Sequence, residues 1–422
     1  MRMVRSMRLN KNLLLSDDFL IFATLVTSMA FRDIPVVSVY AKLIFPLILI
    51  LKHTSGIFRI PRYKWSIYVY YVSFFMLCLF SIGWAVKTDY VLSECFVLAR
   101  LYFTVFALSL VIHNRQDIEK SIYYIHYTGL VLFARLFMNT PMSVWTNSLY
   151  GSFDASSGQG RIGNTIGYHP NELGGVCVLL LLISCYIYSK KGKHKRWLIV
   201  WDIVLCFVLL FTKSRLSLLL ALVGAALFFI LSQHLAYKKI MFVILGVVSS
   251  IAAWYAIFNI PILYELVGFR FAGVVGSASS QDASTLTRMK FLMYAVDLYK
   301  SHPILGVGID NYKYYAYVFQ NAWQEVYAHS NWGELLADTG TIGIFLYYFP
   351  FLLSIYRLVK ERKYLNADLI KLYALMVSFL IVTVIGDIQK MSYDRFDVFF
   401  PSLLAFYTAI YINTEIRALR AQ

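Results

Sequence analysis

The sequence predicts an all-α protein that crosses a membrane many times. Of its 422 residues, 59% are apolar and only 15% are charged, and the mean hydropathy is +0.63. A soluble domain carries about 25% charged residues. The apolar residues form continuous blocks, about as long as the roughly 20 residues that cross a bilayer as a helix. Lipid offers no hydrogen-bond partners to an open backbone, and the blocks do not alternate as barrel strands do, so helices are expected.

The blocks predict about twelve transmembrane helices within a single transmembrane domain, residues 1–422. Some are short, and we expect tilting or flanking residues to complete them. The expected spans are residues 18–31, 36–51, 65–84, 91–113, 121–138, 171–188, 197–212, 216–233, 240–259, 341–356, 368–386 and 396–413.

The basic residues predict the orientation of these spans. One set of alternate connections, which includes both termini, holds twice as many lysines and arginines as the other set. The densest basic cluster lies at 190–196. Because basic connections stay in the cytoplasm, both termini are expected there. The first apolar block lacks the small-residue cleavage pattern of a signal peptide.

Charge and cysteine content exclude other classes of protein. The formal net charge is +16, which in a soluble protein suggests nucleic-acid binding. Here the basic connections account for much of it, so no nucleic-acid partner is expected. All five cysteines fall in apolar blocks. They predict buried packing residues rather than a disulfide framework or a metal site.

Two outer connections are large enough to carry a function. Residues 139–170 form a loop rich in Gly, Ser and Asn, and residues 260–340 exceed an ordinary connection. The second contains a predicted helix capped by Ser284 or Thr285 that ends near Ser301. Another helix is expected to begin near Ser330.

Four polar groups are expected to converge on the outer face. The sequences are GRIGNTIGYHPNELGG, TKSRLS, STLTRMK and YAHSNWGELLADTGTIG. In the first, we expect Asn171 to cap the following helix. The candidate substrate-binding and catalytic residues in these groups are Arg161, His169, Asn171, Lys213, Arg215, Arg288, His329, Asn331 and Glu334.

These residue types suit transfer of a group from a diphosphate. Helix N-termini and arginines bind phosphate through the helix dipole and charge-assisted hydrogen bonds. Arg215 and Arg288 can therefore clamp a pyrophosphate, and His329 can take a proton from a hydroxyl nucleophile. Each also has a structural interpretation, because the arginines can anchor a turn or pair with a carboxylate, and the histidine can cap a helix.

Charged residues inside the expected spans are costly and are therefore also candidates. Lys42 and Arg135 are expected to reach the interface or to pair with a carboxylate, whereas Arg100 sits mid-span and is a candidate substrate-binding residue. The spacing of His, Cys, Asp and Glu predicts no metal site and no cofactor motif.

Residues 160–345 resemble the superfamily of O-antigen ligases and Wzy-type O-antigen polymerases of the bacterial envelope. Four stretches carry the resemblance: GYHPNELGG, TKSRLSLLLALVG, TRMKFLMYAVDLYKSHPILGVGIDNY and HSNWGELLADTGTIGIFLY. Two departures concern the last stretch: Ser330 stands between His329 and Asn331, and Asp338 occupies an expected Glu position.

The resemblance implies a GT-C-like membrane glycosyltransferase that uses undecaprenyl-pyrophosphate-linked glycans without a metal or other cofactor. It implies a multi-pass protein of the bacterial inner membrane whose active site faces outward, with membrane lipid and a chain-length regulator protein as partners. Arg215 and Arg288 correspond to pyrophosphate-binding arginines, and His329 to the base or acceptor-positioning residue.

The acceptor distinguishes two enzymatic hypotheses. A polymerase elongates O-antigen, capsule or exopolysaccharide with another lipid-linked repeat unit, whereas a ligase transfers the glycan to lipid A–core. GYHPNELGG more closely resembles the polymerases, which we therefore prefer. A flippase or other transporter is the alternative from another class, favoured by Arg100 and Arg135 but not by any paired broken helices.

Overall fold

The computed structural model describes residues 16–54, 62–150, 161–190, 195–268, 271–272 and 283–420. Within these ranges the chain forms helices and turns and no strand. The helices outside the two large connections are α2 (Asp17–Met29), α3 (Lys42–Lys52), α5 (Arg62–Phe80), α6 (Thr88–Ser109), α7 (Arg115–Asn139), α9 (Pro170–Ser189), α10 (Lys195–Phe211), α11 (Arg215–Leu231), α12 (Ala236–Asn259), α17 (Asn331–Glu361), α18 (Leu369–Gly386) and α19 (Phe396–Arg420).

Each of the twelve expected spans coincides with one of these helices. Seven of the described helices are long and apolar enough to cross a membrane, and the chain is a polytopic membrane protein. The seven candidate spans are Lys64–Gly83, Thr88–Ser109, Pro170–Ser189, Ala236–Asn259, Asn331–Tyr364, Leu369–Gly386 and Phe396–Ile416.

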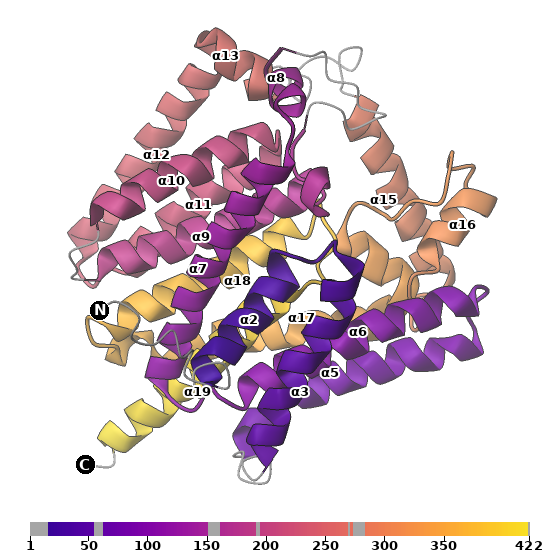
Figure 1. The fold of residues 1–422 in the computed structure, drawn as a ribbon, viewed down its shortest axis with the longest axis horizontal. Coiled ribbons are helices and arrows are strands. Elements are labelled where there is room, and N and C mark those ends of the chain that lie inside the picture. Colours follow the sequence, from indigo (N-terminus) through magenta and orange to yellow (C-terminus); the bar gives the residue numbers. More distant parts are fainter. Residues whose placement is uncertain are drawn as a thin grey trace, which may run out of the picture.

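The long helices pack in two connected groups (Figure 1). Helices α10, α9, α11 and α12 lie side by side, and α18 packs against both α9 and α11. In the other group, α17 packs against α5 and α19, while α6 packs against α3, α5 and α19. Most residues of α18 are buried, whereas no residue of α12 is, as expected for a central helix and a lipid-facing one.

The two large connections carry further helices. These are α8 (Met142–Tyr150), α13 (Pro261–Leu263), α15 (Ala283–Ser301) and α16 (Tyr312–Phe319). Figure 1 shows α15 and α16 at one edge of the molecule. We call the end of the bundle that carries these helices the outer end. Residues 151–160, 269–270 and 273–282 of the two connections lie outside the described residues, as do the side chains of the expected caps Ser284 and Thr285.

A glycine joint connects the end of α15 to α17. Gly306 and Gly308 have positive φ angles, and the N–H of Gly308 donates to the carbonyl of Asp338 at 2.9 Å. A Cβ atom on Gly306 would lie 2.3 Å from the carbonyl carbon of Asp338. At Gly340 the backbone of α17 leaves the helical conformation, with φ 61° and ψ −162°. The helix expected to begin near Ser330 is thus confirmed as the first segment of α17.

Two expectations about individual residues have clear outcomes. Arg135 pairs with Asp33, whose carboxylate accepts two guanidinium hydrogen bonds at 2.5 and 2.6 Å, so pairing is confirmed. The cysteines are free, but the expectation that all are buried is wrong, because Cys206 is exposed on α10 and Cys185 is half-buried. A small apolar thiol is tolerated on a lipid-facing surface as well as in a core.

Candidate functional site

The first turn of α9 places the GYHPNELGG residues at the outer end. His169 caps this helix, because its Nδ1 accepts a hydrogen bond from the N–H of Asn171 at 3.3 Å. Pro170 follows in the first helical position, where its missing N–H is not needed. The prediction that Asn171 caps α9 is therefore wrong. Asn171 lies inside the first turn, since the proline fixes the helix start one residue earlier.

Arg161 joins the first two sequence groups. Its Nε donates to the carbonyl of Thr212 at 2.8 Å, and its Nη2 donates to Oδ1 of Asn171 at 2.7 Å. Lys213 is buried and has a φ of 50°, which is uncommon for a residue with a side chain. Arg215 is also buried and begins α11. The structure thus brings the start of α9 and the turn before α11 together.

Close packing of α9 and α11 requires a glycine at their contact. A Cβ atom on Gly174 would lie 2.5 Å from Oγ of Ser217 and 3.4 Å from Cβ of Ser214. The two serine hydroxyls hydrogen-bond each other at 2.9 Å. The glycine of the NELGG sequence therefore lets the N-termini of two helices, with their positive dipole ends, approach each other.

Aromatic rings hold His329 against α15. Its imidazole stacks on Phe291 with ring centroids 5.7 Å apart, and the Tyr327 ring lies 4.1 Å away. Phe291 follows Arg288 by three residues, so the histidine is fixed beside the turn of α15 that carries the arginine. His329 has a φ of 54°, another uncommon backbone conformation. Its Nδ1 is buried without a hydrogen bond to any described residue.

His329 and His169 share a positively charged environment. Burial lowers the pKa of His329 to about 3, with further lowering by Arg288 and His169. Burial also lowers the pKa of His169 to about 4, and the positive charges of Arg161, Arg288 and Arg395 act in the same direction, against Glu172. Both imidazoles are therefore neutral at pH 7 and lie among cations. Such a site is suited to an anion.

The connection between α18 and α19 supplies charged residues that sequence reasoning missed. Arg395 pairs with Glu172 of α9 and also with Asp397, to which its Nη2 donates at 2.8 Å. Glu172 pairs in addition with Arg32 at 3.2 Å. The sequence DRFD at the start of the last span could have indicated these charged residues, because charges at that depth require partners. This network ties the first and last parts of the chain to the start of α9.

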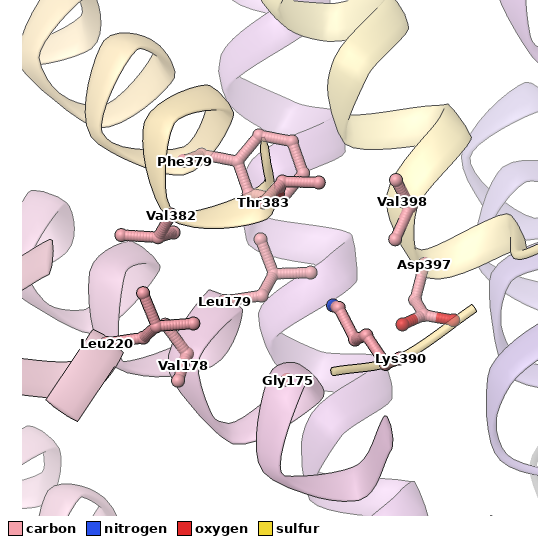
Figure 2. A pocket seen from close by; sticks show the side chains of 10 residues that line it. All are labelled: Gly175, Val178, Leu179, Leu220, Phe379, Val382, Thr383, Lys390, Asp397 and Val398. Carbon is pink, nitrogen blue, oxygen red and sulfur yellow. The ribbon is translucent and has the colours of Figure 1, made fainter. Parts of the chain in front are cut away.

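Sequence reasoning also missed Lys390, whose side chain extends into the bundle (Figure 2). A cavity of about 20 Å³ lies beside it between α9, α11, α18 and α19. A Cβ atom on Gly175 would lie 2.8 Å from the lysine Nζ, so the glycine makes room for the ammonium group. Burial lowers the pKa of Lys390, and Asp387 and Asp397 oppose that effect. Its position just beyond the C-terminus of α18 also suits the helix dipole.

Asn331 and Glu334, both predicted to bind substrate, are bonded to the protein itself. Oδ1 of Asn331 accepts hydrogen bonds from the N–H groups of Ser392 at 2.9 Å and Tyr393 at 3.1 Å. Oε2 of Glu334 accepts the N–H of Ala328 at 2.5 Å. Both side chains are fully buried. These contacts give each residue a structural role in positioning the segments around His329.

Arg100 lies in another part of the bundle. Its guanidinium is 5.4 Å from the centre of the Phe96 ring, midway along α6. That helix packs against α3, α5 and α19, whereas α9 and α11 pack against each other and α18. The structure therefore does not bring Arg100 to the other candidates. In the described ranges, no group of three His, Cys, Asp or Glu residues is arranged to hold a metal ion.

Comparison with known proteins matches part of the chain to a family model. Residues 200–348 match a family model described as O-antigen ligase. The matched region contains Arg215, Arg288 and His329, and it covers about a third of the chain. No curated protein matches the chain. This match supports the resemblance of residues 200–348 to the superfamily of O-antigen ligases and polymerases, a family of glycosyltransferase-like membrane enzymes.

Proposed function

We propose that the protein polymerises undecaprenyl-pyrophosphate-linked oligosaccharide repeat units at the outer face of the bacterial cytoplasmic membrane. The observation that carries this proposal is the convergence of Arg288, His169 and His329 at the outer end. Two of these residues lie in the region that matches the O-antigen ligase family. Both termini would then be cytoplasmic, and a chain-length regulator would be a natural partner.

The proposed reaction forms one bond and breaks one. A hydroxyl oxygen of the acceptor sugar attacks the anomeric carbon of the lipid-linked glycan. The bond from that carbon to the diphosphate oxygen breaks, and the lipid diphosphate leaves with the electron pair. The hydroxyl proton passes to His329, whose neutral imidazole can accept it.

The cations stabilise the charge that develops on the departing diphosphate. Arg215 and Arg288 make bidentate contacts with phosphate oxygens, and Lys213 and Arg161 add positive charge from the neighbouring turn. Electrostatic stabilisation of this kind is usually the largest single contribution to catalysis. The same arginines serve binding of the donor before the reaction.

The donor itself adjusts the basicity of His329. Without a ligand, burial and Arg288 hold the histidine pKa at about 3. A diphosphate brings negative charge between the arginines and the imidazole, which favours the protonated form. The base therefore becomes effective only when the donor is bound.

A ligase is the second candidate, because the matching family model is described as O-antigen ligase. Both activities use the same donor and leaving group and differ in the acceptor. For the polymerase, the resemblance of the GYHPNELGG sequence remains the supporting observation.

Reconstitution with a purified lipid-linked repeat unit separates the two activities. A polymerase produces a ladder of lengthened glycans from that substrate alone. Product that forms only after lipid A–core is added identifies a ligase. If neither mixture yields product from a donor of matched glycan structure, the proposed function is wrong.

A further inference from the structure

The hydrogen bond that caps α9 fixes the proton position on His169. Nδ1 accepts the N–H of Asn171 at 3.3 Å, so this nitrogen carries a lone pair and no proton. In a neutral imidazole the proton must then reside on Nε2. Nε2 is therefore a hydrogen-bond donor.

The surroundings keep His169 in this neutral state. Arg161, Arg288 and Arg395 disfavour a positive imidazole, while Glu172 favours it. Glu172 is already paired with Arg395 and with Arg32. Protonation of Nδ1 would also place two donors opposite each other and break the cap.

The donor edge of His169 is not used by the α9 cap. The ring is only partly buried, and within the described part of the chain Nε2 makes no hydrogen bond. The edge lies on the side of the ring opposite the capped helix terminus. The groups that act on this ring include Arg288 and Arg161, and His169 in turn acts on His329. Arg161 is held beside this ring, because its Nη2 donates at 2.7 Å to Oδ1 of Asn171, the residue whose N–H His169 accepts.

We propose that His169 donates a hydrogen bond from Nε2 to a phosphate oxygen of the lipid-linked donor, while His329 alone acts as the proton acceptor. This inference rests on the proposed function and assigns different roles to the two neighbouring histidines. A neutral donor strengthens its bond as negative charge builds on the leaving diphosphate. Because Nδ1 of His169 is engaged in the helix cap, His169 does not compete with His329 for the proton of the acceptor hydroxyl.

Two substitutions separate the donor from the cap. In His169→Asn, the side-chain oxygen takes the place of Nδ1 and still caps the helix, but the donor at Nε2 is lost. In His169→Gln, the amide N–H₂ reaches about the position of Nε2–H, but the cap is lost. His169→Ala removes both. His302 is exposed at the end of α15, so His302→Asn is the matched control.

Transfer kinetics give the first test in the reconstituted full-length protein. We expect kcat to fall about 10²-fold in His169→Asn and to remain within about 10-fold of wild type in His169→Gln. His302→Asn should match wild type. Wild-type kcat in His169→Asn would overturn the inference. So would loss in His169→Gln as complete as in His169→Ala, because a role as base or as cap predicts that result.

Binding gives a second test that does not depend on transfer. The affinity of the purified protein for undecaprenyl diphosphate without a sugar can be measured in detergent. We expect His169→Asn to bind it at least about 10-fold more weakly than wild type and His169→Gln to bind it nearly as well. If wild type binds the lipid diphosphate more tightly than His169→Asn does but transfers no glycan, the proposed function and the role of His329 fail, while the hydrogen bond from His169 to the diphosphate stands. Equal binding by wild type and His169→Asn, or no binding by wild type, overturns the inference.

Discussion

Two polar regions lie beside the first segment of α17 and differ in what their side chains contact. The cationic region contains Arg161, His169, Arg288 and His329, and its imidazoles lie among positive charges. The acidic region contains Glu94, Asp310, Glu334, Asp338 and Asp394, whose carboxylates lie close enough to repel one another.

Two carboxylates of the acidic region, those of Asp338 and Glu334, bind backbone N–H groups. Oδ1 of Asp338 accepts the N–H of Tyr312 and Oδ2 accepts that of Asp310, each at 2.7 Å. Glu334 accepts the N–H of Ala328. In the cationic region, by contrast, Nε2 of His169 donates no hydrogen bond to the described residues. Polar residues of one motif therefore divide by their hydrogen bonds. Carboxylates that bind backbone N–H groups shape the site, and neighbouring side chains whose donors no described residue uses are the candidates for binding substrate.

The largest expected effect concerns Arg215, which follows the turn that Arg161 of the cationic region binds. Arg215→Ala should reduce transfer about 10²–10³-fold, because it removes a bidentate partner of the leaving diphosphate. Arg215→Lys should recover only part of the loss, since an ammonium group cannot form the planar double contact. Initial rates in proteoliposomes measure both. Wild-type rates in Arg215→Ala would remove this residue from the site.

A substitution in the acidic region should affect stability instead. Asp338→Ala leaves two buried N–H groups without an acceptor, and we expect it to lower the free energy of unfolding by about 2–4 kcal/mol. Unfolding in detergent, followed by tryptophan fluorescence, measures the change. The exposed Asp297 on α15 provides the control Asp297→Ala, which should unfold like wild type. A stable Asp338→Ala protein with lost activity would contradict the division between the regions.

Substitution of Asn331 tests whether this motif residue supports the fold or binds substrate. Asn331→Ala removes the acceptor for Ser392 and Tyr393, and we expect a loss of about 1–3 kcal/mol in stability. Because this loop also carries Arg395, kcat should fall with little change in the donor KM. An unchanged unfolding temperature combined with a raised KM would show that Asn331 binds substrate, as its sequence motif predicts.

The smallest effect concerns pH. His329 has a pKa lowered to about 3 in the ligand-free site, so the base is deprotonated at every pH above about 4. The value of kcat/KM, which reports on the free enzyme, should therefore show no acidic limb from His329 between pH 8 and pH 5. A limb near pH 6.5 that disappears in His329→Gln would show that the imidazole is not shielded as the structure indicates.

The sequence predicts the helices well because their chemistry is local. All twelve apolar blocks form helices, and the break at Gly340 follows from a residue that alone tolerates its backbone conformation. The pairing of Arg135 was expected for the same reason, since a charge at that depth requires a partner.

The remaining features depend on contacts between distant parts of the chain. Arg395 forms an ion pair with Glu172, although more than half of the chain's length separates them in the sequence. No periodicity predicts such a pair. The capping role of His169 depended on where Pro170 starts the helix, which displaced the expected cap at Asn171. The motif residues Asn331 and Glu334 share their sequence context with His329, so only their hydrogen bonds distinguish them from it.

The central claim is that Arg288 beside the two histidines stabilises a leaving lipid diphosphate. Its most direct test is the transfer rate of Arg288→Ala beside that of Lys290→Ala, whose exposed lysine lies two residues further along α15. Both proteins should reach the membrane and unfold like wild type. The account predicts that Arg288→Ala loses at least about 10²-fold in rate while Lys290→Ala matches wild type. A well-folded Arg288→Ala protein that transfers glycan at the wild-type rate would contradict it.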